Sequence, residues 1–105
     1  MARKKNDDVV PVIFKIETGV IRSVLAVFPT EPGTNSPYTC SCYRHVGQHG
    51  WCDERSASDL KPAKPSEYAD LKRELERIGY RLEVRSRFTR HDLETRKSIL
   101  ADIRR

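Results

Sequence analysis

One short stretch holds most of the side chains that could do chemistry. All three cysteines, two of the three histidines and the only tryptophan lie between residues 38 and 52, in the pattern Cys-x-Cys-x2-His-x3-His-x2-Cys. Thiolates and imidazoles are ligands that zinc prefers, and a thiolate beside a histidine is a common nucleophile. The stretch therefore admits three interpretations: a metal site, a reactive thiol, or a shaped turn that contacts a partner.

A metal site would draw on Cys40, Cys42, His45, His49 and Cys52. If residues 38–46 form a strand, Cys40 and Cys42 point to one face and His45 to the other, so the ligands do not all converge without a bulge. No pair has the common Cys-x2-Cys spacing of zinc sites. We therefore expect no obligatory cofactor, with zinc as the alternative. The simpler interpretation is that Cys40 and Cys42 are small buried side chains under a helix.

A catalytic thiol would require Cys52 to meet His49 across the turn, with Asp53 or Gln48 orienting the imidazole. The chain has no phosphate-cradling glycine loop, no paired-carboxylate motif and no nucleotide fingerprint, and 105 residues leave little room to enclose a substrate. We therefore expect no enzyme activity and assign no catalytic residue.

The third interpretation is a polar turn that displays contact residues. Gly47 and Gly50 permit backbone conformations that other residues resist, and they bracket Gln48 and His49 beside the amphipathic ring of Trp51. Such a turn is suited to binding a protein or a nucleotide base, or it uses its own side chains to satisfy its backbone groups. Both interpretations remain open at this point.

Several strands must position this turn. Residues 9–16 and 20–28 are rich in β-branched side chains and are separated by a turn at Gly19, which predicts a hairpin. Residues 29–37 contain three prolines and form a loop, and residues 38–46 alternate as a third strand. Residues 53–64 have no consistent period and are expected to be a connector.

The second half of the chain predicts two helices and a fourth strand. Apolar residues at helical spacing, with Pro65 in the first turn and Gly79 at the end, predict a helix over 65–79. Residues 80–88 alternate as a strand. Thr89 and Asp92 resemble a capping box at the start of a basic helix with a thin apolar stripe. The expected fold is α+β, with a small antiparallel sheet in the order β-β-β-α-β backed by one helix, and a C-terminal basic helix.

The domain organisation expected is a flexible N-terminus over residues 1–8, a single α+β domain over 9–88 and the C-terminal helix over 89–105. No run of residues is apolar enough to span a membrane, and the N-terminus lacks the core of a signal peptide. An odd number of cysteines favours free thiols in a reducing compartment. We therefore expect a soluble protein in the cytoplasm.

The net charge of +5 is concentrated near the C-terminus. Residues 81–105 carry eight basic and four acidic side chains, and contribute +4 of the total. In the predicted last strand, Arg81, Arg85 and Arg87 alternate with apolar residues and should form a row of cations. Such a row would follow a phosphate backbone or an acidic protein patch, or would serve only solubility. Replacing all three arginines by glutamine is expected to leave the fold intact.

Residues 10–88 resemble a largely uncharacterised family of small bacterial proteins carried on phages, prophages and conjugative elements. The likeness rests on the first strand, on the segment His-Val-Gly-Gln-His-Gly at residues 45–50, and on Pro-Ser-Glu-Tyr-Ala-Asp-Leu-Lys-Arg-Glu-Leu-Glu at residues 65–76. This resemblance implies that His45, Gln48, His49 and the adjoining glycines are signature positions. Trp51 and Cys52 depart from the small residues of that pattern, which weakens a zinc site requiring Cys52.

In size and in its mobile-element character the chain also resembles anti-CRISPR proteins that inhibit type II Cas9. That resemblance implies a stoichiometric inhibitor whose partner is a protein or a ribonucleoprotein such as Cas9 with its guide RNA. A nucleic-acid-binding module using the basic strand and helix is the alternative, and a zinc-stabilised interaction protein is the next. The partner-binding residues expected share exposure and polarity or charge: His45, Gln48, His49, Trp51, Arg81, Arg85 and Arg87.

Overall fold

The computed structural model of the protein describes residues 9–17, 23–44 and 48–104. Its elements, in chain order, are β1 (Val9–Glu17), β2 (Ser23–Phe28), β3 (Thr39–Tyr43), β4 (His49–Asp53), α1 (Glu54–Ser58), β5 (Lys61–Pro62), α2 (Pro65–Ile78), β6 (Arg81–Arg85) and α3 (Arg90–Arg104). The expected α+β class is confirmed, as is the helix at the C-terminal end. The expected turn at Gly19 and the N-terminal segment 1–8 lie outside the described residues.

Strands β1 to β4 form an antiparallel meander in the spatial order β4-β3-β2-β1, and both β5 and β6 pair with β1. β5 is antiparallel to β1, but β6 is parallel to it, with Val9 opposite Arg81 and Ile13 opposite Arg85. The expectation of an antiparallel arrangement is therefore wrong for β6 alone. A helix links β6 to the preceding strand, so β6 escapes the hairpin geometry that forces neighbouring strands to be antiparallel.

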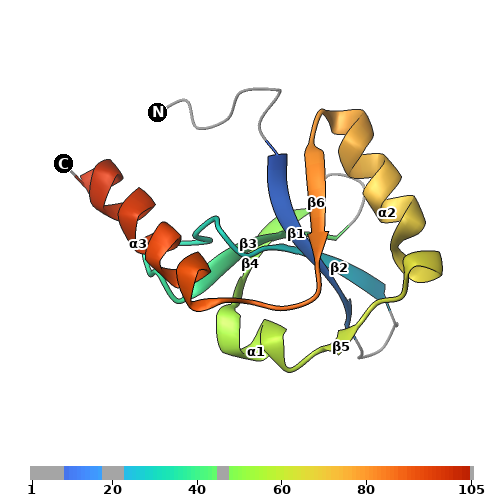
Figure 1. Ribbon diagram of the computed structural model, residues 1–105, viewed down its shortest axis with the longest axis horizontal. Helices are drawn as coiled ribbons and strands as arrows, with labels where there is room; N and C mark the ends of the chain where they lie inside the picture. The colour runs from blue at the N-terminus through green and yellow to red at the C-terminus, as the bar shows by residue number, and fades with distance from the viewer. Residues whose placement is uncertain (1–8, 18–22, 45–47, 105) are drawn as a thin grey trace.

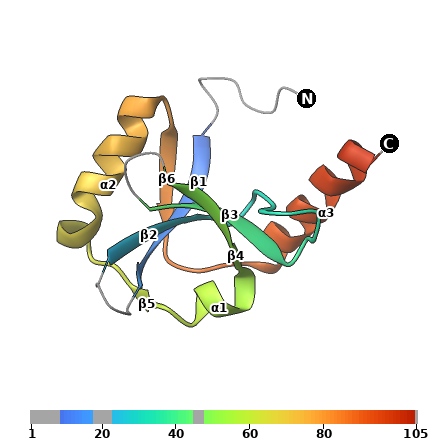
Figure 2. The same ribbon diagram turned by 180° about the vertical axis from the view of Figure 1, so that it is seen from behind.

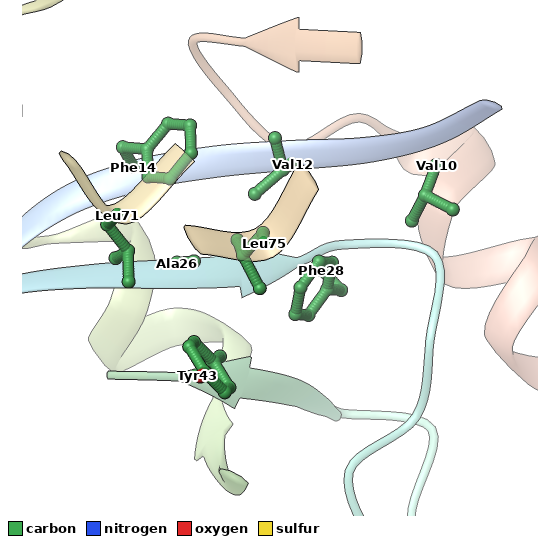
Figure 3. Packing of buried hydrophobic residues seen from close by; sticks show 8 residues of the cluster. All are labelled: Val10, Val12, Phe14, Ala26, Phe28, Tyr43, Leu71 and Leu75. Atoms are coloured by element: carbon green, nitrogen blue, oxygen red, sulfur yellow. The ribbon is translucent and has the colours of Figure 1, made fainter. Parts of the chain in front are cut away.

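One face of the sheet packs against α2. Leu71 and Leu75 of the helix lie over side chains from the first three strands, and Figure 3 shows this cluster from close by. The buried members of the cluster are Val10, Val12, Phe14, Ala26, Phe28, Tyr43, Leu71 and Leu75. Burial of such side chains against one stripe of a helix is the main source of stability in a small domain.

The caps of α2 agree with the pattern expected from the sequence. The backbone N–H of Lys64 donates to Oε1 of Glu67 at 2.8 Å, which satisfies one of the free donors at the start of the helix. Gly79 ends the helix with φ of 127°, a conformation that favours glycine, and its N–H donates to the carbonyl oxygen of Leu75 at 3.2 Å. The helix predicted over 65–79 is therefore confirmed.

The opposite face of the sheet carries a second, smaller cluster. Its buried members are Leu25, Val27, Cys40, Cys42 and Ala57, and Cys52, Leu60 and Phe88 pack against them. Cys40 and Cys42 are thus buried, but they lie beneath α1 and the segment leading to α3, and not beneath α2. Their alternation with Tyr43, which faces α2, explains why they point away from that helix.

The segment 53–64 is more ordered than the expected connector. β4 extends the sheet beside β3, the side chain of Asp53 caps α1 by accepting from the N–H of Ser56, and β5 pairs with β1. The third strand is correspondingly shorter than expected, ending at Tyr43. His49 and Gly50, which were expected to lie in a turn, are instead the first two residues of β4, which pairs with β3.

Helices α2 and α3 lie on opposite sides of the strands, and the far end of α3 extends away from the body of the molecule (Figures 1 and 2). Of the expected apolar stripe, Leu100 is buried, Leu93 is half-buried and Ile103 is 63% exposed. The helix instead buries two charged side chains, Asp92 and Arg96. The attachment of α3 therefore depends strongly on polar contacts.

Candidate functional site

The structure separates the expected contact residues into two groups at opposite edges of the sheet. Gln48, His49 and Trp51 lie at β4, the strand at one end of the sheet, whereas Arg81 and Arg85 lie on β6 at the other end. His45 lies outside the described residues. The two groups therefore belong to different surfaces, and the β4 edge retains most of the residues singled out in the sequence.

β4 is an edge strand whose only pairing partner within the described residues is β3. His49, Gly50, Trp51 and Asp53 are exposed, and Cys52 is half-buried. Trp51 pairs with Ser41 of β3, and 56% of the surface of Trp51 is exposed to solvent. Edge strands present unpaired backbone donors and acceptors, and a large exposed aromatic beside such an edge marks it as a contact surface.

The base of Trp51 is packed closely against the proline-rich loop. A Cβ added at Gly33 would lie 2.4 Å from Cβ of Trp51 and 2.6 Å from the carbonyl oxygen of Cys40. Only glycine fits there without a shift of the loop or of β4. The loop is further joined to β3 by the N–H of Ser41, which donates to the carbonyl oxygen of Glu31 at 2.9 Å. The tryptophan therefore stands on a braced base with an exposed ring.

His49 is also held in place on the α2 side of the hairpin. Its ring meets that of Tyr43 edge to face, with centroids 4.7 Å apart and an interplanar angle of 67°. The hydroxyl of Tyr43 donates to Oε2 of Glu74 on α2. This chain of contacts couples the exposed edge to the helix, so that the imidazole is presented in a fixed orientation.

Gln48 lines a hollow of about 630 Å³ between the β3–β4 hairpin and α2. The hollow carries three arginines and three carboxylate side chains, so its charges are mixed. Its lining residues are Ser23, Val24, Arg44, Gln48, Glu67, Asp70, Leu71, Arg73, Glu74 and Arg77. Arg44 is held by Glu17, with Nη2 at 2.7 Å from Oε2 and Nε at 2.9 Å from Oε1. Such a lining suits polar contacts of both signs.

The three thiols gather on the face of the hairpin that points away from α2. A hydrogen bond with Cys52, with further help from the Arg44 guanidinium, lowers the pKa of Cys42 to about 7. The same hydrogen bond, together with burial, raises the pKa of Cys52. Burial raises the pKa of Cys40 to about 12. Of the three thiols, Cys42 therefore ionises most readily, whereas burial disfavours the thiolate of Cys40.

His49 does not join these thiols. Its ring contacts Tyr43 on one face of the sheet, while Cys52 packs in the cluster on the other face, because neighbouring positions of a strand alternate. The pairing with His49 that a Cys52 nucleophile would require is thus not formed. Within the described ranges, no group of three or more histidine, cysteine, aspartate or glutamate side chains is arranged to hold a metal ion.

The arginine row of the last strand differs from the expected one. β6 ends at Arg85, so Arg87 lies beyond the strand. Nη2 of Arg85 donates to Oδ1 of the buried Asp92 at 3.0 Å, while Arg81 and Arg87 are exposed. Arg85 is therefore a structural residue, and replacing all three arginines would remove the partner of a buried carboxylate. The expectation that the triple variant keeps the fold intact is not supported by this geometry.

Sequence reasoning missed Arg96, which is fully buried. Nε donates to the carbonyl oxygen of Pro37 at 2.7 Å, Nη1 to that of Pro29 at 2.5 Å, and Nη2 to Oε1 of Glu54. One signal was present, because Arg96 lies on the same helical stripe as Leu93 and Leu100. These contacts fasten α3 to the loop that braces Trp51.

Comparison of the chain with protein-family models, with curated protein sequences and with solved structures gave no match. None of the described helices is both long enough and apolar enough to cross a membrane. The function must therefore be argued from the geometry of the candidate site, which is an exposed edge strand with Trp51 packed at its base against the proline-rich loop.

Proposed function

We propose that the chain is a small binding protein that acts by stoichiometric association with a protein or ribonucleoprotein partner through the edge of β4. The observation that carries this proposal is the exposed ring of Trp51 on a braced edge strand. Tryptophan is among the residues that most often dominate the free energy of protein association. A rigid base reduces the ordering cost that binding would otherwise incur.

The geometry of β4 favours addition of an extended segment of the partner to the sheet. The outer side of an edge strand offers main-chain hydrogen bonds, and neighbouring side chains supply specificity. Trp51 and His49 lie on the same face of β4, two residues apart, and Gln48 precedes them at the mouth of the mixed-charge hollow. These three side chains would read the partner strand, while the backbone of β4 would hold it.

The first partner to test is a Cas9 nuclease with its guide RNA, so that the protein would serve host-defence evasion by a mobile genetic element. The support for this choice is the resemblance in size and mobile-element character to inhibitors of that class. The net charge of +5 favours contact with a ribonucleoprotein over imitation of DNA in a basic channel. Loading of the guide RNA is therefore expected to strengthen binding.

Direct nucleic-acid binding by the last strand and helix has less support than the sequence indicated. Arg96 is buried against Glu54, and Nη2 of Arg85 is paired with Asp92, so less of the basic pole is available to follow a phosphate backbone. Binding that depended on phosphates would weaken steeply as salt is raised.

The test is a titration of the purified protein into a DNA-cleavage reaction with guide-loaded Cas9 enzymes from several bacteria. Inhibition that saturates near one protein per nuclease is expected. Trp51→Ser should raise the concentration needed for half-inhibition by about 30-fold, the effect of losing a binding hot spot. Ile78→Ser is the matched control, because Ile78 is also a large apolar residue, 54% exposed, but belongs to α2 and not to β4.

The two parts of the proposal fail separately. Full cleavage by every nuclease in the presence of excess wild-type protein would remove Cas9 as the partner. Inhibition by the wild type that Trp51→Ser leaves unchanged would retain the partner and remove the β4 edge as the contact surface. Inhibition lost equally in the Ile78→Ser control would point to a general effect on stability.

A further inference from the structure

A second surface arises where β5 and β6 share one edge of β1. β6 pairs with β1 from Val9 to Ile13, and β5 pairs with it at Lys15 and Ile16. Phe14 falls between these two registers. The two strands then diverge, β5 toward α2 and β6 toward α3, which leaves a notch in the edge of the sheet beside Phe14.

This notch is a cavity of about 470 Å³, within the range of pockets that hold small molecules. Its apolar wall contains two stacked rings: the centroids of Phe14 and Tyr68 lie 4.3 Å apart with an interplanar angle of 13°. Val84 is 38% exposed there, although it was expected to be on the buried face of its strand. The lining residues are Phe14, Pro62, Ala63, Pro65, Tyr68, Val84, Arg85, Ser86, Arg87 and Thr89.

The polar part of the cavity is cationic. Two arginines line it, and none of its lining residues carries a carboxylate. Nη2 of Arg85 is held by Oδ1 of Asp92 at 3.0 Å. Nε of Arg85 is buried and makes no hydrogen bond within the described part of the chain, and Oε1 of Glu83 lies 3.8 Å from it. Arg87 is exposed at the rim, and the hydroxyls of Ser86 and Thr89 belong to the same wall.

From this arrangement we propose that the cavity binds a small aromatic anion, such as an aryl phosphate or aryl carboxylate. Its ring lies against Tyr68 and Val84, where offset stacking and apolar burial are both available, and the buried ring of Phe14 supports Tyr68 from behind. Its anionic group faces Arg87 and the guanidinium of Arg85, which form charge-assisted hydrogen bonds with oxyanions. The wall alone would accept any apolar ring, so the arginines select the charge.

This site is independent of the proposed partner surface, because β6 and β5 lie at the opposite end of the sheet from β4. Asp92 fixes Arg85 in place, so the anion meets a positioned guanidinium. The ligand therefore requires no rearrangement of the fold, and its binding is expected to persist in a Trp51→Ser variant.

The test is titration of the ¹⁵N-labelled full chain with phenyl phosphate, followed by two-dimensional amide spectra, alongside inorganic phosphate and benzyl alcohol. Phenyl phosphate should shift the amides of Ala63, Ser86 and Thr89 with saturation below about 10 mM. Inorganic phosphate, which lacks the ring, and benzyl alcohol, which lacks the charge, should each bind at least about fivefold more weakly. Arg87→Gln should weaken phenyl phosphate by about fivefold, and Lys97→Gln, a change of an exposed cation on α3, should not.

Ala63→Leu provides a second variant, because a larger side chain at this half-buried position fills the cavity without removing a charge. It should abolish the shifts caused by phenyl phosphate while the rest of the spectrum is preserved. No saturable shift at the cavity amides would overturn the proposal, as would equal affinity for inorganic phosphate or for benzyl alcohol. Unchanged affinity in Arg87→Gln would overturn the assigned role of the arginines.

Discussion

Replacement of Arg96 by methionine is expected to be the most damaging single change on α3. Methionine keeps much of the length of the side chain but removes every donor. Three acceptors then lose their partner: the carbonyl oxygens of Pro29 and Pro37, and the carboxylate of Glu54. A buried acceptor left unpaired costs about 1–3 kcal/mol, and removal of one partner of a buried ion pair costs about 3–5 kcal/mol.

The lower end of the ion-pair range, about 3 kcal/mol, is the better estimate for this site. The side chain of Glu54 is 25% exposed, so water can hydrate its carboxylate after the substitution, while Arg96 itself is completely buried. We therefore expect Arg96→Met to reduce the free energy of unfolding by about 3 kcal/mol. At about 4–8 °C for each kcal/mol in a domain of this size, the Tm should fall by about 12–24 °C.

Urea unfolding at pH 7, followed by circular dichroism, measures this loss. Lys97→Met on the exposed face of the same helix is the control and should change stability by less than about 0.5 kcal/mol. Hydrogen exchange should separate detachment of α3 from global unfolding, because detachment alone would expose α3 amides and leave those of β1 and β2 protected. A loss below about 1 kcal/mol in both measurements would refute the view that Arg96 fastens the helix.

Three further changes test other parts of the structure. Gly33→Ala should destabilise the protein by about 1–3 kcal/mol in urea unfolding, because its Cβ would meet Trp51 and the carbonyl of Cys40; an unchanged midpoint would show that the loop moves freely. Burial raises the pKa of Cys40 from 9.0 to about 12, so its contribution to stability is fully present well below pH 9.0 and is lost as the pH rises toward 12, by about 1.4 kcal/mol for each unit once the unfolded thiol is ionised. Between about pH 10 and 11 the fall in the free energy of unfolding should be smaller by about that amount in Cys40→Ala, and equal slopes would contradict this burial effect. Glu17→Gln removes a carboxylate from a partly exposed pair with Arg44 and should cost less than about 1 kcal/mol by thermal melting, with a larger loss indicating that the pair is more enclosed than its geometry implies.

The elements that were predictable from sequence are those whose signal is local. The helix over 65–79 carries its own apolar period and its own caps, and the first two strands are mostly apolar and contain many β-branched residues. β4 was missed because His49 and Gly50 resemble a turn, and β5 has only two residues. The parallel pairing of β6 with β1 was missed because the residues of a strand do not indicate which other strand it will pair with, or in which direction.

The candidate site shows the same division. Gln48, His49 and Trp51 were identified because unusual residue types cluster in a short segment, although their position on an edge strand became clear only in the structure. The roles of the arginines depend on partners distant in sequence. Arg96 meets Glu54 across 42 positions, and no period or spacing in the sequence predicts that contact. Charge patterning therefore overestimated the number of cations available to a partner.

The shared edge of β1 has a consequence for how the chain reaches its folded state. β1 forms hairpin contacts with β2 soon after both are synthesised, but its other edge waits for β6, whose first pair joins Val9 to Arg81. Bringing Arg81 back to Val9 closes a long loop, and this is slow compared with forming the hairpins of the meander, because the entropy cost of closing the loop comes before the contacts are made. Until residues 81–85 emerge from the ribosome, most of that edge of β1 is unpaired and apolar, and it is open to pairing with another chain. We therefore expect aggregation during synthesis to depend on the arrival of β6 more than on the stability of the finished fold.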